Sequence, residues 1–220
     1  MAADCLSAWE ASKWIPVIAD AVQAIAVVGG IYLAFKQLSA WRVQRLGEKR
    51  MELAADILTT ADEVVSAIRN MRSPGAFEGE GLTRKAKDFE TESIKRIRDS
   101  YYVPLERWKT SEDVFKKFET LRPKARVYFE KRLEPYFATL IATPFRIAVA
   151  SRMLIETADE YGDSDQDRIQ RLRASQKKRE EIIWDHSTTG QPDELSIKME
   201  RALEGFTTTL MPLFDVDRKI

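Results

Sequence analysis

The sequence has very few of the residues on which catalytic and metal sites depend. It holds one histidine, His186, and one cysteine, Cys5, which excludes a paired-histidine metal site and an internal disulfide. Neither a G-x-x-x-x-G-K-S/T phosphate loop nor a G-x-S-x-G nucleophile turn occurs. Ile183 stands where a Glu-x-x-His di-iron motif requires glutamate. These absences argue against most enzyme classes, and we expect neither a cofactor nor a metal ion.

The chain also lacks an excess of charge of either sign. Its 35 basic residues balance 35 acidic ones, whereas a domain that binds nucleic acid usually gathers basic residues. Nucleic acid is therefore not indicated as a partner. No segment alternates apolar and polar residues for long enough to predict a β-strand. We expect an all-α fold.

One long apolar run is present, near the N-terminus. Among the 21 residues from 15 to 35 the only charged one is Asp20. As an α-helix this run would be about 31 Å long, close to the thickness of the hydrocarbon core of a bilayer. We predict a transmembrane helix over residues 14–36. The alternative is a hydrophobic helix buried in a soluble bundle.

Basic residues lie mainly on one side of this run. A single lysine precedes it, whereas five basic residues follow it closely: Lys36, Arg42, Arg45, Lys49 and Arg50. Because basic residues are retained on the cytoplasmic side, we expect residues 1–13 outside the cell and residues 37–220 in the cytoplasm. The run is too long for a typical cleaved signal peptide, which predicts an uncleaved single-pass anchor.

The rest of the chain shows the pattern of successive amphipathic helices. Apolar residues between 53 and 68 recur at spacings of three and four, and no helix breaker lies between 36 and 72. The span is therefore predicted to continue as a helical stalk over 37–72, followed by a loop over 73–82. Further helices are expected within 83–220, the last with Asp193 as its N-cap. Together they predict one cytosolic helical bundle.

Three segments carry a resemblance to known proteins: AADILTTADEVVSAIRNMRSP (54–74), YYVPLERW (101–108) and IKMERALEGFTTTLMPLF (197–214). With the N-terminal run, this combination resembles a group of uncharacterised bacterial proteins that have one N-terminal span and a cytosolic helical domain. The resemblance implies a location in the bacterial inner membrane and the topology given above. It implies no active site.

One pair of residues is a catalytic candidate. Arg179 and His186 are separated by six residues near the end of a polar helix, which is similar to the R-x(4–6)-H signature of the HEPN ribonucleases. That resemblance implies that His186 moves the proton of a 2′-hydroxyl while Arg179 stabilises the phosphate. However, Glu180 follows the arginine, where the family favours Asn, His or Asp. The alternative is a solvated charged helix with a histidine at its C-terminal end, where the helix dipole favours it.

The apolar run also carries a candidate oligomerisation face. On a helix, Asp20, Gln23, Gly30 and Ala34 lie on one side. Ala26, Gly30 and Ala34 follow one another there at the small-xxx-small spacing. Small residues at this spacing allow membrane helices to approach closely. A carboxylate inside a bilayer is costly against lipid, so Asp20 should face a partner helix or water, or be protonated. The alternative is a plain anchor with Asp20 drawn to the interface.

These patterns predict a non-enzymatic, membrane-anchored helical protein that forms a homo-oligomer through its span and binds a cytosolic protein partner. A membrane effector or pore subunit of a bacterial defence system would have such an architecture. The alternative function is that of a membrane-tethered HEPN-like ribonuclease that uses Arg179 and His186.

Overall fold

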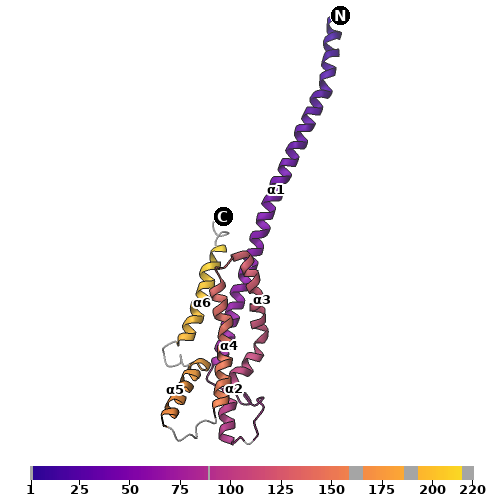
Figure 1. Cartoon of the computed structure of the whole chain (residues 1–220). Helices are drawn as coiled ribbons and strands as arrows, with labels where there is room; N and C mark the ends of the chain where they lie inside the picture. Colours follow the sequence, from indigo (N-terminus) through magenta and orange to yellow (C-terminus); the bar gives the residue numbers. More distant parts are fainter. Residues whose placement is uncertain (1, 89, 159–165, 186–192, 215–220) are drawn as a thin grey trace. The chain divides into compact units, whose positions relative to one another are not determined.

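The computed structural model describes residues 2–88, 90–158, 166–185 and 193–214, of which 2–19, 21–22, 24 and 166–169 are described as backbone only. Over these residues the fold is all-α, as predicted, with no β-strand (Figure 1). The helices are α1 (Ala2–Arg72), α2 (Glu92–Thr110), α3 (Glu112–Phe129), α4 (Glu134–Thr157), α5 (Gln166–Ile183) and α6 (Glu194–Leu210), followed by the short 3₁₀ helix η3 (Met211–Leu213). The chain divides into two compact units, Met1–Arg50 and Met51–Ile220.

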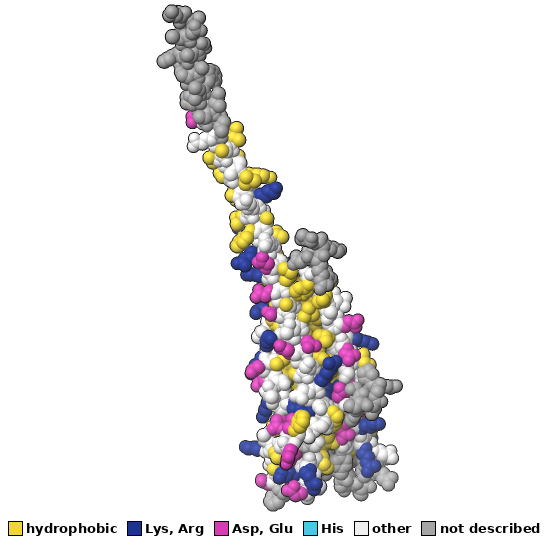
Figure 2. Space-filling view, turned by 180° about the vertical axis from the view of Figure 1, so that it is seen from behind, with side chains coloured by type: hydrophobic (Ala, Val, Ile, Leu, Met, Phe, Trp, Pro, Cys, Tyr) yellow, Lys and Arg dark blue, Asp and Glu magenta, His cyan; other side chains and the backbone are white. Residues whose placement is uncertain are grey.

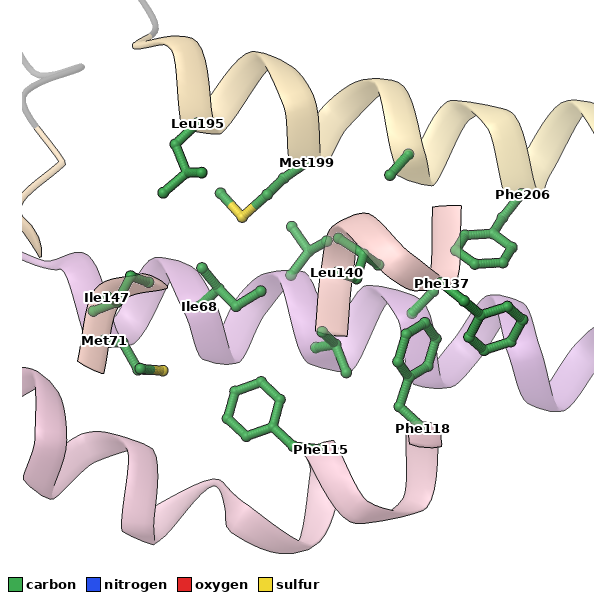
Figure 3. Packing of buried hydrophobic residues seen from close by; sticks show 14 of the residues in the cluster. Ile68, Met71, Phe115, Phe118, Phe137, Leu140, Ile147, Leu195, Met199 and Phe206 are labelled. Carbon is green, nitrogen blue, oxygen red and sulfur yellow. The ribbon is translucent and has the colours of Figure 1, made fainter. Parts of the chain in front are cut away.

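The second unit contains the hydrophobic core, and the C-terminal part of α1 forms one wall of it. Figure 3 shows side chains of this part of α1 between those of α3, α4 and α6. The buried residues of α1 follow the predicted spacing of three and four: Leu53, Ala54, Ile57, Ala61, Val64, Val65, Ile68 and Met71. A helix presents such positions on one face, so this face packs into the core and the opposite face remains polar.

Three phenylalanine rings join α3, α4 and α6 within that core. The centroid of Phe137 lies 4.7 Å from that of Phe118 and 5.0 Å from that of Phe206. The second pair is edge-to-face, with an interplanar angle of 84°, which is a favoured arrangement of aromatic rings. All three side chains are at most 1% exposed, so this cluster fixes how the three helices pack.

Helix α4 lies at the centre of this unit, in contact with α2, α3, α5 and α6. Within the part of the chain that the structure describes, it is the helix long and apolar enough to cross a membrane. Its Phe137, Leu140, Ile147 and Leu154 side chains are nevertheless buried in the core, so we assign it to the bundle. The transmembrane span predicted over residues 14–36 lies within α1 and stays a prediction.

The segment between α1 and α2 is longer than the predicted loop over 73–82, since α2 begins only at Glu92. Thr91 caps α2, its hydroxyl accepting a hydrogen bond from the Ile94 amide at 3.4 Å. Gly81 has a φ of 84°, and a Cβ there would lie 2.2 Å from the Asp99 carbonyl oxygen. Only glycine fits this close approach of the segment to α2.

Candidate functional site

The predicted oligomerisation face is uncovered in the structure. All five of its residues are exposed: Asp20, Gln23, Ala26, Gly30 and Ala34. A Cβ added at Gly30, or at its neighbour Gly29, would meet no atom within 4 Å. No described residue therefore packs against Gly30 on this face, and the pairing of the face with a second copy stays a prediction.

Large apolar side chains surround this part of α1. Eleven of them between residues 25 and 46 are 44–73% exposed: Ile25, Val27, Val28, Ile31, Tyr32, Leu33, Phe35, Leu38, Trp41, Val43 and Leu46. Three are consecutive, and successive residues of a helix point about 100° apart. Figure 2 shows hydrophobic side chains following one another along this helix, with few charged ones among them. Between residues 25 and 35 every residue is apolar, and a helix that is apolar all round requires lipid or other protein as its surroundings.

The apolar segment ends in an arrangement typical of a membrane interface. The guanidinium of Arg45 lies 5.7 Å from the centroid of the Trp41 ring, within the range of a cation–π contact. Arg45 also forms an exposed ion pair with Glu48 at 3.5 Å. Tryptophan and basic residues are enriched where a membrane helix leaves the hydrocarbon. Beyond the apolar segment, exposed charged residues begin at Lys36 and become frequent from Arg42 onward.

The structure places the candidate catalytic residue Arg179 in a groove between α4 and α5. The groove has a volume of about 540 Å³, and Arg146 of α4 lines it together with Arg179. Six apolar residues form the rest of its lining: Ala142, Phe145, Val149, Ala150, Met153 and Ile182. His186 lies outside the described residues. Its pairing with Arg179 therefore stays a prediction.

Sequence reasoning missed three buried arginines, of which Arg72 at the end of α1 is the most deeply enclosed. Its side chain is fully buried and donates hydrogen bonds to the carbonyls of Glu181, Ile182 and Trp184 at 2.9–3.0 Å. It also pairs with the carboxylate of Asp193, which accepts a hydrogen bond from the Ser196 amide at 2.7 Å. Asp193 is thus the N-cap of α6, as predicted, and Arg72 joins the end of α5 to the start of α6.

Arg107 of α2 organises the segment that follows α1. It donates hydrogen bonds to the carbonyls of Asn70 at 2.9 Å, Ser73 at 2.8 Å and Gly75 at 2.5 Å. Arg107 also pairs with the Glu80 carboxylate, at 2.6 Å, and this hydrogen bond lowers the pKa of Glu80. All these partners lie in the chain itself, so Arg107 stabilises a turn and is not oriented toward a ligand.

Arg98 belongs to an ion network that joins the same segment to α2 and α4. The Glu90 carboxylate, 4% exposed, accepts hydrogen bonds from Arg84 at 2.8 Å and from Arg98 at 2.5 Å. Arg84 also pairs with Asp99 at 2.7 Å, and Arg98 donates to the Ile155 carbonyl at 3.0 Å. The hydrogen bonds from Arg84 and then Arg98 lower the pKa of Glu90 to about 2. The network is structural.

No signal in the sequence singles out these arginines among the 35 basic residues, because their burial depends on which carbonyls meet them in space. Within the described ranges, no group of three or more His, Cys, Asp or Glu side chains is placed to hold a metal ion. No family model, curated protein or solved structure matches the chain.

Proposed function

We propose that this chain is a non-enzymatic membrane protein, anchored by residues 14–36, that self-associates through its span and binds a partner protein through its helical bundle. The observation that carries the proposal is the exposure of large apolar side chains all round α1 between residues 25 and 46. Soluble monomers seldom expose continuous apolar surface of this extent. A bilayer would cover the seven of these side chains that lie within the proposed span, from Ile25 to Phe35.

The hydrophobic core supports the assignment of residues 14–36 to a membrane. Among the described side chains, its first member along the chain is Leu53, and every other member follows. The bundle therefore encloses its core without the apolar N-terminal segment, which is left for another environment. The excess of basic residues after position 35 favours a cytoplasmic bundle, and a bacterial inner membrane is the location proposed. By analogy of architecture, the proposal extends to an effector or pore subunit of a bacterial defence system.

Self-association is proposed through the side of the span that carries Ala26, Gly30 and Ala34. Their small side chains let a second helix approach closely, and the space beside Gly30 is open. Gln23, exposed on the same side, adds a hydrogen-bonding group to that face. Membrane helices joined in this way would form a homo-oligomer.

The self-association is tested by Gly30→Ile in the full-length chain in detergent, with oligomeric state measured by light scattering. The larger side chain should obstruct the close approach and shift the wild-type oligomer toward monomer. Gly29→Ile is the matched control, because residue 29 points about 100° away from residue 30 and should leave the oligomer intact. A monomeric wild type, or equal assembly of Gly30→Ile and wild type, would contradict self-association through the span and leave it the role of an anchor alone.

The topology is tested by cysteine labelling in intact bacterial cells. A membrane-impermeant maleimide should modify Cys5 but not a cysteine that replaces Ser187 in a Cys5→Ser background. Permeabilised cells provide the control, since both sites should react there. Labelling of position 187 in intact cells, or purification of the full chain as a soluble monomer without detergent, would contradict the proposed anchor.

A further inference from the structure

The groove between α4 and α5 is only partly filled by the bundle's own packing: Ala150 belongs to the buried core, and the Phe145 ring packs edge-to-face on Trp108 with centroids 5.3 Å apart. Its most exposed apolar residues follow one another along α4 at spacings of four: Phe145, Val149 and Met153, which are 50%, 54% and 47% exposed. Other apolar side chains of α4, such as Ile147 and Leu154, face the core and are buried. Helix α4 thus has two apolar faces, and the described part of the chain covers only one of them.

The dimensions of the exposed face suit a short helix. From Ala142 to Met153 the lining extends over twelve residues, whose eleven rises give about 16 Å of helix or three turns. A partner helix in such a groove presents anchors at positions i, i+4 and i+7. The apolar lining disfavours an extended polar ligand such as a nucleic-acid strand, whose phosphates require cations and whose backbone is strongly hydrated.

The charges at the groove have one sign. Arg146 and Arg179 line it, and no acidic residue does. Neither arginine forms a hydrogen bond or ion pair with a described residue. The carboxylate of Glu194 forms its ion pair with Lys198, at 2.5 Å. Compared with Lys198, Arg146 contributes only a weaker electrostatic lowering of the pKa of Glu194. An occupant that carries carboxylates beside its apolar anchors would pair both arginines.

We propose that the groove between α4 and α5 binds an amphipathic helix of a partner protein that has acidic residues beside its apolar face. The proposal rests on the partner-binding role proposed above and specifies the surface and the chemistry of the partner. Phe145, Val149 and Met153 hold the apolar anchors, and Arg146 and Arg179 select acidic flanks. Complementary charges at an interface provide specificity in this way.

The test uses the full-length chain in nanodiscs and a displayed library of helical peptides. Each peptide of about 14 residues carries leucine at i, i+4 and i+7, with the flanking positions randomised among Glu, Gln and Lys. The proposal expects selected peptides to be enriched in Glu. A selected peptide should bind Val149→Glu or the double variant Arg146→Glu/Arg179→Glu about tenfold more weakly, or worse.

Matched variants separate the groove from general charge. Arg152 is exposed on α4 but does not line the groove, so Arg152→Glu should change affinity by less than about twofold, as expected of a screened charge away from the contact. Peptides with Lys in place of Glu should regain binding to the double variant. Circular dichroism spectra identical to wild type would show that these surface changes leave the bundle folded.

Several outcomes would overturn the proposal. Selected peptides without an excess of Glu, or equal binding by wild type and double variant, would do so. Loss of self-association in Val149→Glu without peptide would assign the groove to a second copy. Binding of single-stranded RNA that needs Arg146 and Arg179 but not Val149 would assign it to nucleic acid. The membrane anchor and the self-association tested by Gly30→Ile depend on other residues. Failure of the groove proposal would therefore not contradict them.

Discussion

At the scale of single residues, the bundle depends on buried arginines that neutralise helix ends. Arg72 has no exposed surface, whereas its acidic partner Asp193 retains 22%, so the charge of the pair is only partly hidden from water. A buried cation is costly unless its donors are paired. Every nitrogen of the Arg72 guanidinium has a hydrogen-bond partner, among them the carbonyl oxygens at the end of α5. Arg72 is therefore a structural residue rather than a ligand-binding one.

Replacement of this arginine should be among the most damaging single changes. Arg72→Leu leaves the carbonyls of α5 and the Asp193 carboxylate without their donor, and we expect a loss of about 3–5 kcal/mol in the free energy of unfolding. Hydrogen exchange should rise at the end of α5 and the start of α6. Arg69→Leu is the control: Arg69 forms only an exposed pair with Glu200 at 3.5 Å, worth less than about 1 kcal/mol. Equal effects of the two changes would contradict this account.

The Glu90 network predicts a particular dependence of stability on pH. The folded-state pKa of Glu90 is about 2, below its ordinary value of 4.5. The carboxylate therefore stabilises the fold at pH values above 4.5, and this contribution is lost as the pH falls from 4.5 toward 2. Glu90→Gln should lower the urea midpoint at pH 7, and its difference from wild type should shrink over that window. Glu78→Gln, an exposed change in the same segment, should show little effect at any pH.

At the scale of elements, α4 and α6 meet at a glycine. A Cβ at Gly205 would lie 2.3 Å from the ring of Tyr136, and that ring also packs edge-to-face on Phe206 with centroids 5.5 Å apart. Gly205 thus has no side chain because α6 has to approach α4 closely at this turn. Helical propensity, which favours alanine, is overridden here by packing.

This contact predicts opposite outcomes for two Gly→Ala changes. Gly205→Ala should destabilise the bundle by about 1–3 kcal/mol, because the Tyr136 ring has to move. Gly47→Ala should be neutral or stabilising by up to about 1 kcal/mol, since nothing lies within 4 Å of that position. Thermal unfolding of both variants, followed by circular dichroism, checks the pair. A stable Gly205→Ala protein would show that Tyr136 moves freely.

The sequence predicted where the helices lie better than it predicted which of their faces remain exposed. Spacings of three and four identified the buried face of α1 over 53–68, because burial on one side of a helix leaves that periodic trace. Asp193 was identifiable as an N-cap by its side chain and position. The groove was not, since an apolar helix such as α4 does not reveal in its composition which of its faces the core uses. Arg179 and Arg146 are 33 positions apart, and only the packing of α4 on α5 brings them to one groove.

At the scale of the whole molecule, the division into Met1–Arg50 and Met51–Ile220 separates two kinds of surface. Among the described side chains, the first unit exposes apolar ones, and the buried hydrophobic core lies in the second. The proposed membrane span lies in the first unit, and the helical bundle lies in the second. The proposed self-association involves the first unit, and the proposed binding of a partner protein involves the second.

This division predicts that residues 51–220 fold alone. Expressed without the first fifty residues, they should be soluble without detergent, helical by circular dichroism and cooperative in thermal unfolding. The same fragment with Ile57→Asp, which introduces a charge at a fully buried position, should fail to fold. A wild-type fragment that aggregates or lacks a cooperative transition would show that the first unit is needed by the bundle.

The contacts of Arg72 also determine when the bundle can close during synthesis. Its partner Asp193 follows 121 positions later, so at bacterial or eukaryotic translation rates the two emerge about 6–24 seconds apart. During that interval the apolar face of α1 over 53–71 has no α6 to pack against. If the N-terminal segment has already inserted into a membrane as proposed, the nascent chain would remain there incompletely folded, with this apolar face exposed. Chaperone capture of ribosome-bound intermediates should therefore be strongest after α1 has emerged and cease once α6 is complete.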